Sequence, residues 1–69
     1  MNRTPVSSSA LRSVGYDPAT LTLETELSSG RVYQYLDVPE SVFTEFMNAP
    51  SLGIYYNKSI KNDYRCVKL

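Results

Sequence analysis

The sequence of 69 residues contains no histidine, no tryptophan and one cysteine, Cys66. Histidine is the commonest general base and a frequent metal ligand, so its absence argues against acid–base catalysis and against a zinc site. A single cysteine forms no internal disulfide, and without a histidine it has no base to activate its thiol. We therefore predict that the chain has no catalytic residues, no metal, no cofactor and no enzymatic activity.

Long apolar runs are also missing from the chain. No stretch approaches the roughly 18 apolar residues that a membrane helix needs, and the first nine residues lack the apolar run of a signal peptide. Because small secreted domains usually carry several disulfides, we predict a cytoplasmic protein without membrane association. The length indicates one domain over residues 8–69, preceded by a flexible N-terminal arm over residues 1–7.

An excess of charge of either sign is absent, because seven cations balance seven acidic side chains. This balance argues against strong non-specific attraction to a polyanion. The distribution is uneven, however. Residues 1–51 carry three arginines against six acidic residues, whereas residues 52–69 carry four cations against Asp63. The basic C-terminal third is interpreted either as a solubilising surface near a helix end or as part of a binding surface.

The clearest pattern that is present is a β-hairpin over residues 21–36. Leucines alternate with threonine and glutamate over Leu21–Leu27, a second strand follows over Arg31–Leu36, and Ser28-Ser29-Gly30 closes the two strands. A three-residue loop requires a positive φ only at its last position, which Gly30 supplies. The favoured register then places Leu27 opposite Arg31, Thr25 opposite Tyr33 and Leu23 opposite Tyr35.

This register decides which face of the sheet carries Tyr33 and Tyr35. In the favoured register both rings lie on the leucine face, as packing groups whose hydroxyls reach the rim. A register shifted by one residue would place them beside Glu26 and Glu24 on the outer face, as an exposed aromatic pair typical of a binding surface. The turn chemistry favours the leucine face. Glu24 and Glu26 are expected to be solvated carboxylates.

The remaining elements are predicted from the spacing of apolar residues and from the positions of proline and capping residues. Ser8–Tyr16 is a candidate first strand, and an apolar stripe that ends in Phe46 and Ala49 predicts a helix beginning near Pro39. Ser51 can cap a second helix over Leu52–Lys61. The predicted fold class is α+β: a three-stranded antiparallel meander with two helices on one face, in the order β-β-β-α-α. The segment Tyr64–Leu69 is the candidate for a short fourth strand at the sheet edge.

Six tyrosines are the most distinctive functional feature of the sequence. Tyrosine packs at a core boundary, and it also stacks on nucleic-acid bases while nearby cations contact phosphates. This combination fits single-stranded RNA, and it fits a protein-binding hot spot equally well. The candidate nucleic-acid-binding residues are Tyr33, Tyr35, Arg31, Gln34, Lys58, Lys61 and Arg65.

From about Ser8 to Tyr64 the chain resembles a known family. The residues that carry the resemblance are Gly15-Tyr16-Asp17, Leu21, Gly30, Tyr33-x-Tyr35, Val38-Pro39, Phe46, Ala49, Ser51, Gly53, Tyr56-Asn57, Ile60 and Tyr64. In this order they are similar to the KTSC domain, a short domain of some lysyl-tRNA synthetase C-termini and of stand-alone bacterial proteins. The resemblance implies an uncharacterised function for which RNA binding has been proposed.

These observations predict a small binding module with weak contact to RNA or tRNA. Contact is expected to be weak because the net charge is zero and because Gln34, rather than a basic residue, lies between the two tyrosines. The alternative is a protein–protein interaction module, a homodimer or an adaptor, that binds no nucleic acid.

Overall fold

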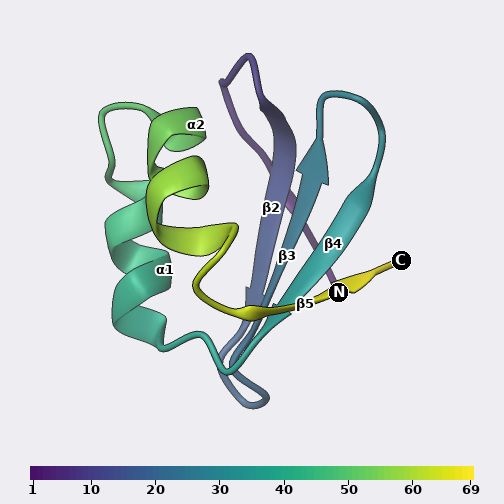
Figure 1. Cartoon of the computed structure of the whole chain (residues 1–69), viewed down its shortest axis with the longest axis vertical. Coiled ribbons are helices and arrows are strands. Elements are labelled where there is room, and N and C mark those ends of the chain that lie inside the picture. The colour runs from purple at the N-terminus through teal and green to yellow at the C-terminus, as the bar shows by residue number, and fades with distance from the viewer.

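The sheet and its helical cover form two layers in the computed structural model, which describes residues 1–69 (Figure 1). Five antiparallel strands follow one another across the sheet in the order β1-β2-β3-β4-β5, and the helices cover one face. The elements are β1 (Thr4–Pro5), β2 (Leu11–Asp17), β3 (Thr22–Leu27), β4 (Val32–Leu36), α1 (Glu40–Met47), α2 (Leu52–Tyr55), the π-helical turn η1 (Tyr56–Ile60) and β5 (Arg65–Lys68).

The β3–β4 hairpin has the register that its turn chemistry predicts. Gly30 has a φ of +95°, and the Leu27 amide donates to the Arg31 carbonyl over 2.8 Å. Leu23 therefore lies opposite Tyr35, and Thr25 lies opposite Tyr33. Both tyrosines are on the helix-covered face, so the alternative register is wrong.

The prediction of three strands, with a candidate fourth, was incomplete at the N-terminal edge. Thr4 and Pro5 pair with β2 as the edge strand β1, and the Val6 amide donates to the Arg12 carbonyl over 3.0 Å. We predicted an arm here because the segment is polar and because Pro5, which donates no amide hydrogen, was expected to prevent regular pairing. At a sheet edge, a missing amide hydrogen is tolerated. The candidate C-terminal strand is confirmed as β5, which pairs with β4.

Leu21 lies in the turn before β3 instead of starting the strand. Its φ of 55° is in the left-handed region, and its side chain is 41% exposed. The Leu21 carbonyl accepts a hydrogen bond from the Val38 amide over 2.9 Å, which ties this turn to the segment that leads into α1. The leucine pattern of the inner face therefore begins at Leu23.

The second helix begins as predicted and then changes its winding. Ser51 caps α2, because its hydroxyl accepts a hydrogen bond from the Ile54 amide over 3.3 Å. The following turn is wider than an α-helix, since the Lys61 amide donates to the Tyr56 carbonyl five residues earlier, over 2.9 Å. We predicted an α-helix throughout, because a side-chain pattern does not distinguish an i+4 from an i+5 bond.

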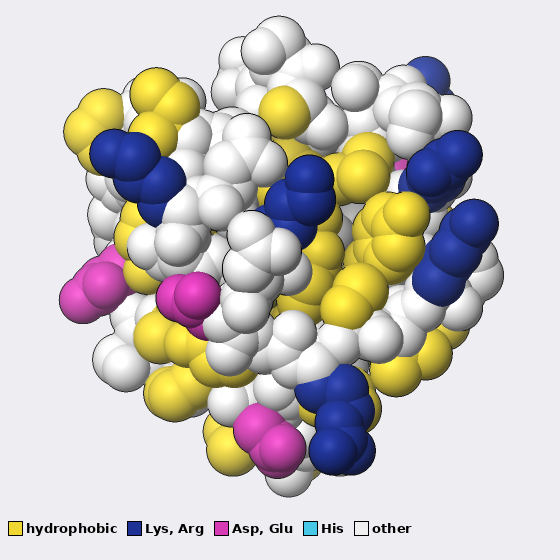
Figure 2. Space-filling model, in the orientation of Figure 1, with side chains coloured by type: hydrophobic (Ala, Val, Ile, Leu, Met, Phe, Trp, Pro, Cys, Tyr) yellow, Lys and Arg dark blue, Asp and Glu magenta, His cyan; other side chains and the backbone are white.

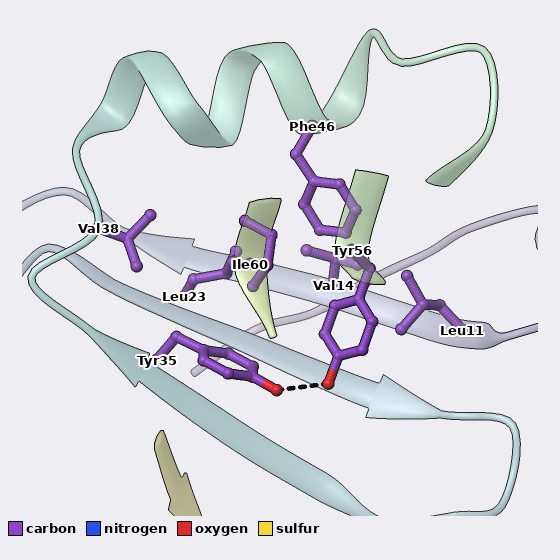
Figure 3. Close-up of a cluster of buried hydrophobic side chains, with 8 residues drawn as sticks. All are labelled: Leu11, Val14, Leu23, Tyr35, Val38, Phe46, Tyr56 and Ile60. Atoms are coloured by element: carbon purple, nitrogen blue, oxygen red, sulfur yellow. Dashed lines mark hydrogen bonds between the residues drawn. The ribbon is translucent and has the colours of Figure 1, made fainter. Parts of the chain in front are cut away.

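Eight buried side chains form the core between the sheet and the helices (Figure 3). Phe46 from α1 is completely buried, as predicted, and Ile60 from η1 is also inaccessible to solvent. The full set is Leu11, Val14, Leu23, Tyr35, Val38, Phe46, Tyr56 and Ile60. No helix combines the length and the apolar character needed to cross a bilayer. No cluster of three or more acidic, cysteine or histidine side chains is placed to bind a metal ion.

Candidate functional site

A groove of about 490 Å³ opens between η1 and the turn end of the β3–β4 hairpin. We call it the tyrosine groove. It is lined by Ala10, Leu27, Ser28, Ser29, Arg31, Tyr33, Tyr35, Tyr56, Asn57, Lys61, Asn62 and Cys66. In the space-filling view, exposed hydrophobic side chains between the helices and the sheet have cationic side chains on both sides (Figure 2). The groove therefore combines an apolar surface with a basic rim.

Tyr35 and Tyr56 form the deepest part of the groove. Their rings converge from β4 and η1 in an edge-on arrangement, with centroids 5.9 Å apart and hydroxyls hydrogen-bonded to each other (Figure 3). Their side chains are only 2% and 5% exposed. Burial, and then the hydrogen bond with Tyr56, raises the pKa of the Tyr35 phenol above its ordinary value of 10. Cys66, opposite Tyr35 on β5, contributes to the same rise in pKa.

Tyr33 also lines the groove and is only partly buried, unlike Tyr35 and Tyr56. Arg31 approaches from the hairpin turn, and Lys61 approaches from the end of η1. Lys68 lies directly opposite Tyr33 on β5, so its side chain is on the same face of the sheet. The ion pair of this structure joins Arg3 to Glu24, which leaves these three cations without an acidic partner.

The other three predicted site residues lie elsewhere. Gln34 points to the opposite face of the sheet, where its amide donates to Glu24 over 2.9 Å. Lys58 lines a separate hollow beside Ile54 on the outer side of the helix. Arg65 lies opposite Leu36, and alternation along β4 places Leu36 on the same face as Gln34. Arg65 is therefore also on the Gln34 face. Of the seven candidates, the fold therefore brings together Arg31, Tyr33, Tyr35 and Lys61.

The prediction that the strand carboxylates are solvated is wrong for Glu24. It is 5% exposed, and its carboxylate accepts hydrogen bonds from Arg3 over 2.7 Å and from Gln34 over 2.9 Å. The N-terminal segment provides Arg3 and covers this part of the outer face. The prediction failed because it treated that segment as an arm, which left the outer face open.

A profile of the KTSC domain matches residues 7–64. The chain belongs to the KTSC domain family. A crystal structure of a KTSC domain protein from Yersinia pestis superimposes with a TM-score of 0.96 at 43% identity, covering 99% of this chain and 96% of that one. The predicted resemblance to the KTSC domain family is thereby confirmed.

Relatives of this KTSC domain occur both as small proteins and within a larger enzyme. An uncharacterized protein from Stutzerimonas stutzeri is 46% identical over 61 residues, which is 88% of this chain and 86% of that protein. A lysine–tRNA ligase from Nostoc sp. strain PCC 7120 is 41% identical over 61 residues. That match covers 88% of this chain but 11% of the ligase. The KTSC domain is thus a small part of the ligase.

Four residues that carry the family resemblance line the tyrosine groove. They are Tyr33, Tyr35, Tyr56 and Asn57, which come from β4 and η1. A binding role was predicted only for Tyr33 and Tyr35. Tyr56-Asn57 stood in the family pattern, and that signal could have identified them. No sequence pattern indicated Asn62 and Cys66, because their place in the groove depends on the pairing of β5 with β4.

Proposed function

We propose that this KTSC domain is a binding module that contacts single-stranded RNA through the tyrosine groove. The observation that supports the proposal most directly is the meeting of a half-buried ring, Tyr33, with two cations that have no acidic partner, Arg31 and Lys61. Single-strand binding sites combine these two features, because rings stack on bases and cations contact phosphates. The kinship with lysine–tRNA ligases, whose name includes tRNA, points to the same class of partner.

The proposed contact is weak and local. The net charge of zero provides no long-range attraction, so affinity depends on the few cations at the groove. Tyr35 is too deeply buried to stack on a base, which leaves one ring for that role. We therefore expect affinity near the weak end of non-specific binding, about 10⁻⁴ M at physiological salt, with tighter binding at low salt.

The test compares two double variants that remove the same charge. Arg31→Gln with Lys61→Gln removes the groove cations, whereas Lys58→Gln with Arg65→Gln removes two cations outside the groove. Titration of labelled single-stranded RNA over a range of salt concentrations gives the number of phosphate contacts. Each lost contact lowers the steepness of the salt dependence by about 0.7. We expect a loss of about 1.4 for the groove pair and little change for the control pair.

If the two double variants lowered the salt dependence equally, the tyrosine groove would not be the RNA-binding site. If the unmodified chain bound no RNA at low salt, RNA would not be its partner. In that case β5 is the better candidate surface, because it is an exposed edge strand that can accept another strand. Size measurements at two protein concentrations would then test for a homodimer through this edge.

A further inference from the structure

We infer that the tyrosine groove takes a single unpaired nucleotide, whose base stacks on Tyr33 and contacts the hydroxyls of Tyr35 and Tyr56. This inference rests on the RNA-binding function proposed above and specifies the unit that the site recognises. The occupant is one nucleotide of a single strand, rather than a run of stacked bases or the surface of a duplex.

The number of bases follows from the number of accessible rings. Stacking requires a ring face that the protein leaves free. The groove contains three tyrosines, but Tyr35 and Tyr56 are 2% and 5% exposed, and their rings pack against each other. Tyr33 alone is partly open. A volume of about 490 Å³ lies within the range of small-ligand sites, roughly 300–1,000 Å³. The number of accessible rings therefore points to one base, and the volume is that of a small-ligand site.

The hydroxyl pair has one more proton than its own hydrogen bond uses, and both tyrosines line the groove. One of the two phenolic protons joins Tyr35 to Tyr56, so the other hydroxyl keeps its own proton for a further acceptor. The side chains of Asn57 and Asn62, which also line the groove, make no hydrogen bond within the chain. Hydroxyls and amides both donate and accept, so this set suits the edge of any of the four bases.

The cations are placed for the phosphates of the same nucleotide. Arg31 belongs to the hairpin turn and Lys61 follows η1, so the two approach the groove from different elements. Both cations line the same groove as Tyr33, and neither is neutralised by an acidic partner. Charge complementarity therefore favours a nucleotide, which carries a phosphate, over a neutral aromatic ligand.

The test varies the number of bases on an oligonucleotide backbone of constant length and charge. One oligonucleotide is fully abasic, a second carries one base, a third carries two adjacent bases and a fourth carries all bases. We expect the first base to tighten binding by roughly tenfold, the effect of one stacking contact. The second adjacent base is expected to add less than about twofold. Stepwise gains of equal size with each base would overturn the inference.

Two variants test the assigned contacts, and both are compared with Tyr55→Phe, which removes a hydroxyl outside the groove. Tyr33→Leu is expected to abolish the gain from the first base without changing binding of the abasic strand. Tyr35→Phe combined with Tyr56→Phe removes both partners of a buried bond, so no orphan hydroxyl is left to destabilise the fold. This double variant is expected to reduce the gain about threefold or more. Thermal unfolding of each variant confirms that it is folded.

The outcomes separate this inference from the function on which it rests. If abasic and base-bearing strands bind equally well and binding still depends on Arg31 and Lys61, the single-nucleotide site is wrong and RNA binding stands. If the gain from the first base survives in Tyr33→Leu, the stacking assignment is wrong. If no strand binds at low salt, both the inference and the proposed function fail.

Discussion

Tyr16, Tyr35 and Tyr55 each combine a ring packed against the core with a hydroxyl that reaches one defined partner. Tyr16 stacks on Phe43 with ring centroids 4.8 Å apart and donates to the Val38 carbonyl. Tyr55 stacks on Phe46 and donates to Glu45 over 3.2 Å. Tyrosine suits such boundary positions, because one end of the side chain is apolar and the other forms hydrogen bonds. The tyrosine-rich composition is therefore explained mainly by packing.

Alkaline pH tests the burial of Tyr35. Burial and the bond with Tyr56 raise its pKa above 10, whereas the unfolded chain keeps a pKa near 10. Below about pH 10 both states hold the proton, so this residue does not make stability depend on pH. Above about pH 10 the unfolded state releases the proton first, so the free energy of unfolding falls as pH rises. Urea unfolding between about pH 8 and pH 11 measures this decline.

The double variant Tyr35→Phe with Tyr56→Phe serves as the control for that decline. It removes both phenols of the hydrogen-bonded pair, and we expect a shallower fall in stability above about pH 10. Some decline remains, because burial also raises the pKa of Tyr16 and of Tyr55. An equally steep fall in the double variant would show that Tyr35 does not titrate in the way its surroundings imply.

At the scale of the elements, the β3–β4 hairpin positions half of the groove. The turn places Arg31 at the rim, and the register directs Tyr33 and Tyr35 toward the helices. A slip of one residue would turn both rings to the outer face. The conformation of Gly30 in the turn therefore decides where the site lies. The other half comes from η1, whose wide turn presents Tyr56 and Asn57 to the same groove.

Substitution of Gly30 by alanine tests the turn. Its φ of +95° is unfavourable for a residue with a Cβ atom, although no heavy atom lies within 4 Å of the position that this atom would take. The cost is therefore backbone strain without a clash, and we expect a loss of about 1–2 kcal/mol in the free energy of unfolding. Urea unfolding measures it. Ser29→Ala in the same turn is the control, and a loss as large as that of Gly30→Ala would contradict this account.

At the scale of the whole molecule, different parts of the chain pack against the two faces of the sheet. The helices cover the face with Tyr33 and Tyr35, and the N-terminal segment lies over the face with Glu24 (Figure 1). Gly15 allows this second contact, because a Cβ atom there would lie 2.6 Å from the backbone oxygen of Asn2. The ion pair between Arg3 and Glu24 depends on the same approach.

Gly15→Ala is expected to displace the N-terminal segment from the sheet. The variant loses the Arg3–Glu24 contact, and we expect it to be destabilised by about 1–3 kcal/mol. In a chain that lacks residues 1–6, the same substitution has nothing left to displace. It should then cost less than about 0.5 kcal/mol. Urea unfolding of the four chains measures this coupling, and additive effects of the two changes would show that Gly15 and the segment act independently.

Prediction from the sequence succeeded where the cause is local and failed where it is distant. Gly30 and the alternation around Leu23 are neighbours in sequence, and the register they predicted is the one in the structure. Phe46 lies in an apolar stripe, and it is fully buried as expected. The solvation of Glu24 depends on Arg3, 21 residues away, and no local pattern indicates that contact. Leu21 fits the alternation but has the backbone conformation of a turn.

The candidate site shows the same division. Alternation, turn residues and caps were enough to predict the α+β class and the inner-face tyrosines, because each depends on a few neighbouring residues. The family resemblance came instead from an ordered set of residues spread over most of the chain. The assembly of Arg31, Tyr33, Tyr35 and Lys61 into one groove, and the exclusion of Gln34, Lys58 and Arg65, required the packed fold. Such groupings arise when η1 and β5 pack against a distant hairpin, and the energy that holds them there is spread over the whole core.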